Sequence, residues 1–508
     1  MTSTLDPSAD PRRWIALAVC CSALFMTLLD VSITNVALPA IGESTGAGPA
    51  MLQWVVSGYT LSFGLVPVLA GRLGDDHGRR RLFLIGVAGF VVSSALSGLS
   101  PGGGLLIAAR VLQGLSGGLI NPQVSGLVQQ MFRGGDRGRA FGVIGAVVGV
   151  GTALGPLVGG ALIALGGPDF GWRLVFFVNV PIGLAVIALA RRWLPSHPNS
   201  AASTRRHSLD ISGAVMLGLA TFCVLFAAVE YDVVQNLALA WLAAPAAVLL
   251  LLFFRREARL TRERSDPLID LRLFREPSYT AGVLLALVFF CGMTGLPLVL
   301  ALYYQQGLGY TALQSGLGVT AFALGSAVAA PLAGRVVTRI GRPLVVGACL
   351  TFGLGALSLD LVARQEPGNL AALAFAVPLF FTGLGSGAVI TPNQTLTLME
   401  VDPVTGSTAG GVLQTAQRIG SSIGQAVIGA TFFATLPAGV ADIGGSARSD
   451  AYGHALGQAV LVTLVFVLAA LALGFSDLVV NRRRSGRQRH SAGSVPGARD
   501  EGSSPPTP

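Results

Sequence analysis

Long apolar stretches separated by short polar segments dominate this sequence. They predict helical spans near 14–40, 52–71, 82–99, 105–130, 140–166, 173–194, 209–229, 237–254, 279–305, 312–334, 343–363, 370–398, 407–435 and 455–479. Each stretch is long enough to cross a hydrocarbon core of about 30 Å at a rise of about 1.5 Å per residue. Gly-rich segments of this length cannot satisfy their backbone groups in lipid as open strands. The pattern therefore predicts an all-α polytopic membrane protein with about fourteen transmembrane helices.

Composition agrees with this pattern. Of 508 residues, 52% are hydrophobic and 12% are charged, whereas soluble proteins carry about 25% charged residues. The formal net charge is +9, but the arginines cluster in loops between apolar stretches, so we expect no nucleic-acid partner. The cysteines lie inside apolar stretches and show no metal-ligand spacing, and we expect no metal and no cofactor. They are Cys20, Cys21, Cys223, Cys291 and Cys349.

Arginine is distributed unequally between alternate loops. One set of loops carries most of it, including Arg79 to Arg81, Arg133 to Arg139 and Arg335 to Arg342. Because Lys and Arg are retained on the cytoplasmic side of a membrane, these loops and both termini are predicted to face the cytoplasm. The prediction is a multi-pass protein of the cytoplasmic (inner) membrane, in contact with the lipid bilayer.

An internal repeat relates the two parts of the chain. The loop G-R-L-G-D-D-H-G-R-R at 71–80 returns as G-R-V-V-T-R-I-G-R-P at 334–343, and repeats of this kind are common in transporters. The stretch 209–254 has no counterpart, which predicts an inserted hairpin. The predicted organisation is a cytoplasmic N-terminus 1–13, an N-terminal six-helix half 14–194, a linker 195–208, the hairpin 209–254, a cytoplasmic loop 255–278, a C-terminal six-helix half 279–480 and a disordered basic tail 481–508.

Five motifs in a fixed order carry a family resemblance. They are L-D-V-S-I-T-N-V-A-L-P-A-I at 29–41, the loop 71–81, R-V-L-Q-G-L-S-G-G at 110–118, G-T-A-L-G-P-L-V-G-G at 151–160 and W-R-L-V-F-F-V-N-V-P-I-G at 172–183. With them the chain resembles the fourteen-span drug:proton antiporters of the major facilitator superfamily over 14–480. The resemblance implies the major facilitator fold and proton-coupled export of small, largely apolar or cationic drugs or antibiotics by alternating access.

Asp30 is the sharpest single feature. An ionisable side chain inside an apolar span is costly and by default marks a proton or substrate pathway. Counted along their helices, Asp30 and Arg110 both lie roughly 5–10 Å to the external side of the midplane, so the two side chains can meet. We expect Asp30 to carry protons and its protonation to weaken its attraction to Arg110. The resemblance likewise gives Arg110 a proton-transfer role. A purely structural ion pair is the alternative.

Arg418 lies near the middle of a later span, 407–435. A buried guanidinium needs acceptors, which are a carboxylate, a carbonyl or a group of the substrate. Glu400 and Asp402 are at the inner end of the preceding span. Coupling and structural pairing therefore both remain open for Arg418.

Two glycine-containing motifs suggest how the protein moves. Gly71, Asp75, Gly78, Arg79 and Arg80 form a tight loop that the resemblance identifies as a latch between the halves, with a topology signal as the simpler alternative. The second copy has Thr338 in place of Asp75, so we expect no equivalent latch there. A second motif allows close helix approach and a kink, as in an antiporter hinge or in ordinary packing. It consists of Gly151, Gly155, Pro156, Gly159 and Gly160.

Several polar side chains within spans are candidates for a substrate cavity, and each has interhelical hydrogen bonding as its alternative role. They are Asn35, Tyr59, Gln113, Asn121, Tyr303, Tyr304, Asn393 and Gln394. The expected partners are a small-molecule substrate and protons, and the chain is expected to be monomeric. Export of one endogenous metabolite or lipid is an alternative function, and a non-transporting sensor on the same fold is another. An enzyme is not expected, and ATP-driven pumping is excluded because a Walker loop requires lysine, which this sequence lacks.

Overall fold

The computed structural model describes residues 12–195, 210–234, 241–263, 267–365, 371–437, 440 and 446–492. These residues form helices and contain no strand, which confirms the predicted all-α class. The elements are α1 (Arg13–Thr45), α2 (Pro49–Leu65), α3 (Pro67–His77), α4 (Arg79–Leu99), α5 (Gly103–Met131), α6 (Gly134–Phe177), α7 (Asn179–Trp193), α8 (Ile211–Val234), α9 (Ala243–Arg262), η3 (Leu271–Arg275), α10 (Pro277–Leu302), η4 (Tyr303–Gly307), α11 (Ala312–Ile340), α12 (Arg342–Ala363), α13 (Ala371–Ala374), α14 (Ala376–Met399), η6 (Pro403–Thr405), α15 (Gly406–Thr435) and α16 (Ser446–Ala492).

Eight helices in the described part of the chain are individually long and apolar enough to cross a membrane. Two bent pairs raise the number to ten: α2 with α3, bent by 47°, and the two parts of α6, bent by 41°. Pro67 opens α3 at the first bend, where its missing N–H costs no helical hydrogen bond. Helices α8, α9, α14 and α15 lie in the other predicted ranges without meeting the same test. The count of fourteen therefore stays a prediction.

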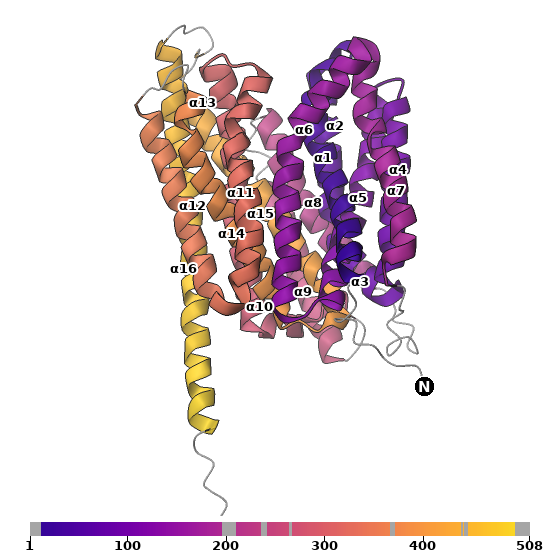
Figure 1. Ribbon diagram of the computed structural model, residues 1–508, viewed down its shortest axis with the longest axis vertical. Coiled ribbons are helices and arrows are strands. Elements are labelled where there is room, and N and C mark those ends of the chain that lie inside the picture. Colours follow the sequence, from indigo (N-terminus) through magenta and orange to yellow (C-terminus); the bar gives the residue numbers. More distant parts are fainter. Residues whose placement is uncertain are drawn as a thin grey trace, which may run out of the picture.

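The helices gather in two groups (Figure 1). Helices α1 to α7, coloured indigo to magenta, pack among themselves, and so do α10 to α16, coloured orange to yellow. Helix α6 lies along α11, and α15 packs against α3 and α5, so these contacts join the groups. Helix α8 contacts α9, α2 and α15. We call α1 to α7 the first group and α10 to α16 the second group.

One end of the bundle carries most of the loop arginines, and we call it the arginine-rich end. The start of α1 lies there, because Arg13 forms a 2.7 Å ion pair with Asp136 at the start of α6. Helix α16 extends beyond the other helices at this end (Figure 1). It continues to Ala492, so residues 481–492 are helical where the sequence predicted disorder, and residues 493–508 lie outside the described part. Residues 1–11 and 196–209 also lie outside it.

Glycines line the contact between α6 and α11. A Cβ added to Gly138 would lie 2.5 Å from the carbonyl oxygen of Gly334, and one added to Gly149 would lie 3.0 Å from the backbone of Ala327. Gly142 and Gly145 lie between these two glycines in the sequence, about one turn apart, and also face α11. The two backbones therefore touch over several turns with few side chains between them. We call this contact the glycine seam.

Candidate functional site

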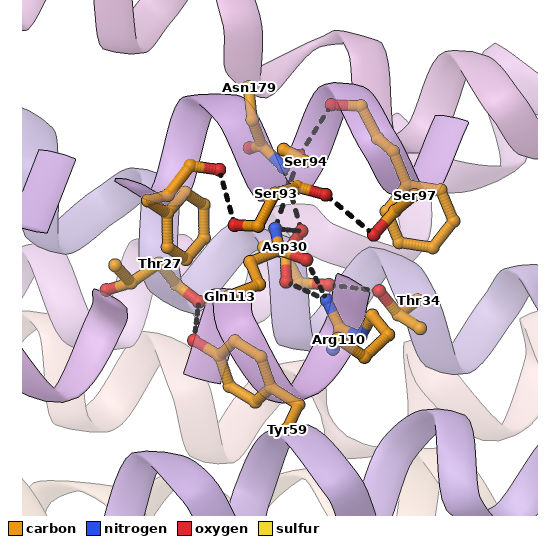
Figure 2. A network of polar contacts seen from close by, with 12 residues as sticks. Thr27, Asp30, Thr34, Tyr59, Ser93, Ser94, Ser97, Arg110, Gln113 and Asn179 are labelled. Atoms are coloured by element: carbon orange, nitrogen blue, oxygen red, sulfur yellow. Dashed lines mark hydrogen bonds and ion pairs between the residues drawn. The ribbon is translucent and has the colours of Figure 1, made fainter. Parts of the chain in front are cut away.

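Asp30 is fully buried within α1 and receives three N–H groups (Figure 2). Its Oδ2 accepts from Arg110 Nη1 at 2.5 Å, and its Oδ1 accepts from Gln113 Nε2 at 2.8 Å and from Asn179 Nδ2 at 2.7 Å. A buried charge persists only when it is paired and hydrogen-bonded. The carboxylate is thus the centre of the site, and the arrangement suits its ionised form.

Arg110 approaches Asp30 from α5 with only 1% of its side chain exposed. Its Nε donates to the carbonyl of Val55 at 3.2 Å, and Nη1 also donates to Gln113 Oε1 at 2.8 Å. The guanidinium carbon lies 4.3 Å from the ring centroid of Tyr59, a cation–π contact. Arg110 therefore has acceptors other than Asp30. It keeps them if Asp30 takes up a proton.

A second layer of polar groups orients the two amides. Ser94 Oγ accepts from Gln113 Nε2 at 3.2 Å and from Asn179 Nδ2 at 3.0 Å, and it donates to the carbonyl of Phe176 at 2.9 Å. Figure 2 shows Ser94 beside the amide of Asn179, on the side of Asp30 away from Tyr59. The site thus combines side chains from α1, α2, α4, α5 and α7. A change of charge at Asp30 therefore acts on five of the seven helices of the first group at once.

Arg418 is not part of this cluster. It lies on α15 in the second group, where its guanidinium carbon stands 4.3 Å from the ring centroid of Phe63 on α2. Neither acid considered from the sequence pairs with it among the described residues: Asp402 caps η6 by accepting from the Val404 N–H, and Glu400 is exposed. Arg418 remains partly exposed. The structure therefore separates it from the predicted proton site.

The loop after α3 joins the two groups at the arginine-rich end. Asp75 accepts from the backbone N–H groups of Ser407 at 3.1 Å and Thr408 at 2.8 Å, at the start of α15, and from Arg79 Nη2 at 2.8 Å. Arg79 also donates to the carbonyls of Pro403 and Val404. Anions are favoured at a helix N-terminus, so Asp75 holds α15 in place.

The glycines of this loop are needed for two different reasons. A Cβ at Gly71 would lie 2.4 Å from the carbonyl oxygen of Ser407, so only glycine permits this approach of α3 to α15. Gly78 has φ +98°, a conformation that other residues rarely adopt, and it turns the chain between α3 and α4. Arg80 is directed elsewhere and donates to the carbonyl of Arg191.

The second copy of the loop makes contacts within the second group. Arg342 forms a 2.5 Å ion pair with Asp477 on α16. It also donates to Asn393 Oδ1 at 2.8 Å and to the carbonyl of Ser278 at 2.7 Å. Asn393 in turn donates to Gly282 at 2.8 Å, so both ends of this predicted cavity residue are engaged. Thr338, in place of Asp75, is exposed, and its Oγ1 would lie 3.6 Å from a Cβ added to Gly135.

The glycine motif of α6 faces α1. A Cβ at Gly155 would lie 2.1 Å from Ser32 Oγ, and one at Gly159 would lie 3.2 Å from Ile33 Cγ2. Gly151 faces Leu28 at 3.3 Å, whereas Gly160 has nothing within 4 Å. The bend of 41° falls between Thr152 and Leu157, around Pro156. Close helix approach and a bend thus coincide at the motif.

The predicted cavity residues are dispersed. Tyr59 and Gln113 belong to the Asp30 site, and Tyr303 and Tyr304 form a buried aromatic cluster with Phe375. Gln394 lies 3.5 Å from Ser125 Oγ across the contact between the groups. Asn35 is exposed and Asn121 is partly exposed.

Sequence reasoning missed two residues of the Asp30 site. Asn179 lies within the motif at 172–183 without a predicted role, although a polar residue in an apolar span is a usable signal. Ser94 gives no such signal, because serine is common in membrane helices. A buried carboxyl at the arginine-rich end was also missed: Glu257 on α9 accepts from the Ile269 N–H at 3.1 Å.

Comparison with known proteins extends these observations. The family model described as Major Facilitator Superfamily matches residues 20–425. The chain is 36% identical over 437 residues to the probable actinorhodin transporter of Streptomyces coelicolor, covering 85% of this chain and 74% of that protein. It is 35% identical over 427 residues to the tetracenomycin C resistance and export protein of Streptomyces glaucescens, covering 82% and 76%. The crystal structure of the human organic anion transporter MFSD10 has the same fold, with a TM-score of 0.61 at 17% identity over 90% of this chain and 100% of that chain.

Proposed function

Because this chain belongs to the Major Facilitator Superfamily, we propose that it is a proton-coupled antiporter that exports small, largely apolar molecules of the drug or antibiotic type. Two relatives are named as an actinorhodin transporter and as a tetracenomycin C export protein, which supports export. Family membership makes the chain a multi-pass membrane transporter and not an enzyme. Proton coupling and the class of molecule are the proposal.

The carboxylate-centred site of Asp30 carries this proposal. Protonation of Asp30 would remove the charge that attracts Arg110. It would also weaken the hydrogen bonds that the amides of Gln113 and Asn179 donate to this carboxylate. Arg110 would keep the carbonyl of Val55 and the ring of Tyr59. One proton therefore switches the site between two hydrogen-bonding arrangements on five helices. A coupling device needs such a two-state element.

Contacts at the arginine-rich end indicate which side of the membrane is closed in this structure. We propose that this end is cytoplasmic, in the inner membrane, and that both termini lie there. The contacts of Asp75 and Arg79 with η6 and α15 then close the cytoplasmic side. The structure would represent an outward-facing state, in which a proton reaches Asp30 from outside. Rocking of the first group against the second would break these contacts and expose the substrate site to the cytoplasm.

The proposed unit is a monomer. We propose two six-helix halves that move against each other, with α8 and α9 as an added hairpin at their contact. Two relatives are each named for a single compound and another is named as a multidrug resistance protein, so both a narrow and a broad range of substrates fit the proposal. A narrow exporter would use the same proton site. Only the residues that contact the substrate would differ.

Export of tetracenomycin C from cells that express the protein tests this function. Accumulation is measured with and without a protonophore, in wild type and in Asp30→Asn. We expect gradient-dependent export in wild type and none in Asp30→Asn, because the amide cannot take up and release a proton. Asp270→Asn is the matched control, since Asp270 caps η3 outside the membrane helices and asparagine caps equally well. Coupled export that survives in Asp30→Asn would move the proton carrier elsewhere.

A further inference from the structure

Arg418 differs from the other interior arginines in what surrounds its charge. Arg79, Arg110 and Arg342 each have a carboxylate and at least one carbonyl or amide oxygen as acceptors. The guanidinium of Arg418 contacts the face of Phe63 and interacts electrostatically with Tyr59. A guanidinium presents five N–H donors at its edge. Among the described residues, no carboxylate, carbonyl or amide oxygen accepts a hydrogen bond from those donors.

The position of Arg418 makes this arrangement significant. It lies near the middle of α15, a helix that packs against α2, α3, α5 and α8. An isolated charge at this depth is expensive, and a contact with an aromatic ring recovers about 0.5–2 kcal/mol, less than an ion pair would. Its side chain keeps some accessible surface, so a small molecule or water can reach it. The site is therefore built for a group that the chain does not supply.

Two polar side chains lie within one turn of Arg418 on the same helix. Gln414 Nε2 donates to Ser125 Oγ at 3.2 Å, whereas its buried Oε1 has no partner among the described residues. The buried hydroxyl of Thr415 likewise has none in this part of the chain. Buried polar atoms are normally hydrogen-bonded, so unpaired atoms next to an unpaired cation indicate a ligand site.

We propose that Arg418 binds an anionic oxygen of the exported molecule, a carboxylate or an ionised phenol or enol, and so selects acidic aromatic compounds. The flat guanidinium, stacked on Phe63, accepts a carboxylate through two parallel hydrogen bonds. The same positive charge repels amines. This assignment rests on the proposed export function, and it replaces the cationic class expected from the sequence.

The aromatic residues of α2 connect this site with Asp30. Tyr59 and Phe63 lie one turn apart with ring centroids 5.8 Å from each other. Arg110 stacks on Tyr59 and Arg418 stacks on Phe63, each at 4.3 Å. A negative charge bound at Arg418 therefore acts on the same helix that contacts the Asp30–Arg110 pair. Movement of α2 links substrate binding with protonation.

Binding of three matched probes to the full-length protein in lipid nanodiscs tests the inference. The probes are anthracene carboxylate, anthracene methanol and anthracene methylamine, which share one ring system and differ in charge. Equilibrium dialysis at neutral pH measures binding, with empty nanodiscs as the blank. We expect wild type to bind the carboxylate at least about tenfold more tightly than the amine, a difference of about 1.4 kcal/mol.

Substitutions then assign the preference to Arg418. Arg418→Gln should remove it, and Arg418→Lys should keep part of it, because lysine supplies the charge without the planar fork. Arg339→Gln is the matched control, since Arg339 is exposed at the arginine-rich end and loses the same charge. Thermal unfolding of each variant verifies that it is folded. Equal binding of the three probes by wild type, binding of none, or a preference that survives in Arg418→Gln overturns the proposal.

Transport of the same probes separates this inference from the proposed function. Carboxylate binding that depends on Arg418, without proton-coupled transport, contradicts export and leaves the binding site intact. Proton-coupled export of the alcohol or the amine by both wild type and Arg418→Gln supports export and contradicts the assignment of Arg418.

Discussion

The first and second groups of helices each bury an ion pair of the same length, but the pairs are built around opposite charges. In the first group three N–H groups converge on the carboxylate of Asp30. In the second group three acceptors, from Asp477, Asn393 and Ser278, surround the guanidinium of Arg342. A carboxylate can take up a proton at accessible pH, whereas an arginine in a protein stays charged. Under the function proposed above, the pair centred on Asp30 switches with protonation, whereas the pair centred on Arg342 holds α12 and α16 together.

The two copies of the loop repeat this contrast. Asp75 of the first copy is an acid that accepts five N–H or O–H groups, including backbone N–H groups at the start of α15. The second copy has Thr338 at this place, and its Arg342 is directed into its own group. In the proposed cycle, the contacts that break are thus provided by acids of the first group. The second group provides the buried arginine Arg342 and, near the contact with α2, Arg418.

The largest expected effect comes from removing the two acids in turn. Asp477→Asn should lower the free energy of unfolding by roughly 3–5 kcal/mol, because it leaves the buried charge of Arg342 without its carboxylate. If Asp30 is the proposed proton carrier, Asp30→Asn should cost only roughly 1 kcal/mol, the net value of a hydrogen bond, because the site must then accommodate a neutral side chain. Denaturant-induced unfolding in mild detergent measures both. Equal losses would mean that the two pairs are alike.

The next effect concerns the loop copies. Asp75→Asn should raise the population that is open at the arginine-rich end by at least about tenfold, because hydrogen bonds to a charged group contribute about 1.5–3 kcal/mol. Distances between spin labels on Arg139 and Arg339, both exposed, measure this population. Thr338→Ala, at the matching position of the second copy, should leave the distances unchanged. A shift of similar size in Thr338→Ala would contradict the asymmetry.

A smaller effect is expected at the ring between the two arginines. Tyr59→Leu removes the cation–π contact with Arg110, worth about 0.5–2 kcal/mol, and should slow proton-coupled export by about two- to thirtyfold. Tyr59→Phe keeps the ring and loses only a 3.5 Å hydrogen bond to Thr27, so its rate should remain near that of wild type. Transport rates at several pH values provide the test. Equal rates in the two variants would show that the ring is not needed.

The smallest effect is a local pH dependence at the base of α8 and α9. Burial raises the pKa of Glu257 to about 7, and the neighbouring Asp210 adds to this. Asp210 itself has its pKa lowered to about 2: burial opposes its charge, but hydrogen bonds from Arg256 and the Gly213 N–H outweigh burial. Protonated Glu257 thus stabilises this region at acidic pH, and the stabilisation is lost as the pH rises through about 7.

Hydrogen exchange measures this dependence. The amide of Ile269 donates to Glu257. Above neutral pH, its hydrogen exchange rate should rise more steeply than the intrinsic exchange rate of an unprotected amide. Glu257→Gln should show only the intrinsic rate. The same excess in Glu257→Gln would assign the effect to another group. The melting temperature should hardly change, because the contact is confined to this base.

The sequence predicted the pairing of Asp30 with Arg110, since the helical rise alone places both at one depth. It did not predict which amides complete the site, because Gln113 and Asn179 lie on different helices whose facing sides depend on packing. Helix ends were also predicted poorly where polar helices continue beyond the membrane, as in α9 and α16. The fold class followed from apolar length, whereas the partners of each polar group required the packed structure.

The glycine seam has a consequence for how such a protein can change over evolutionary time. Helix surfaces without interlocking side chains can slide past each other easily. An added methyl group at Gly142 would lie 3.0 Å from the backbone of Pro331 and would hinder movement of α6 against α11. Hindering this movement slows turnover without altering the contacts proposed for Arg418 and Asp30. Under these proposals, efflux capacity and selectivity are encoded at separate places in the chain. Selection can adjust how fast the protein works independently of what it carries.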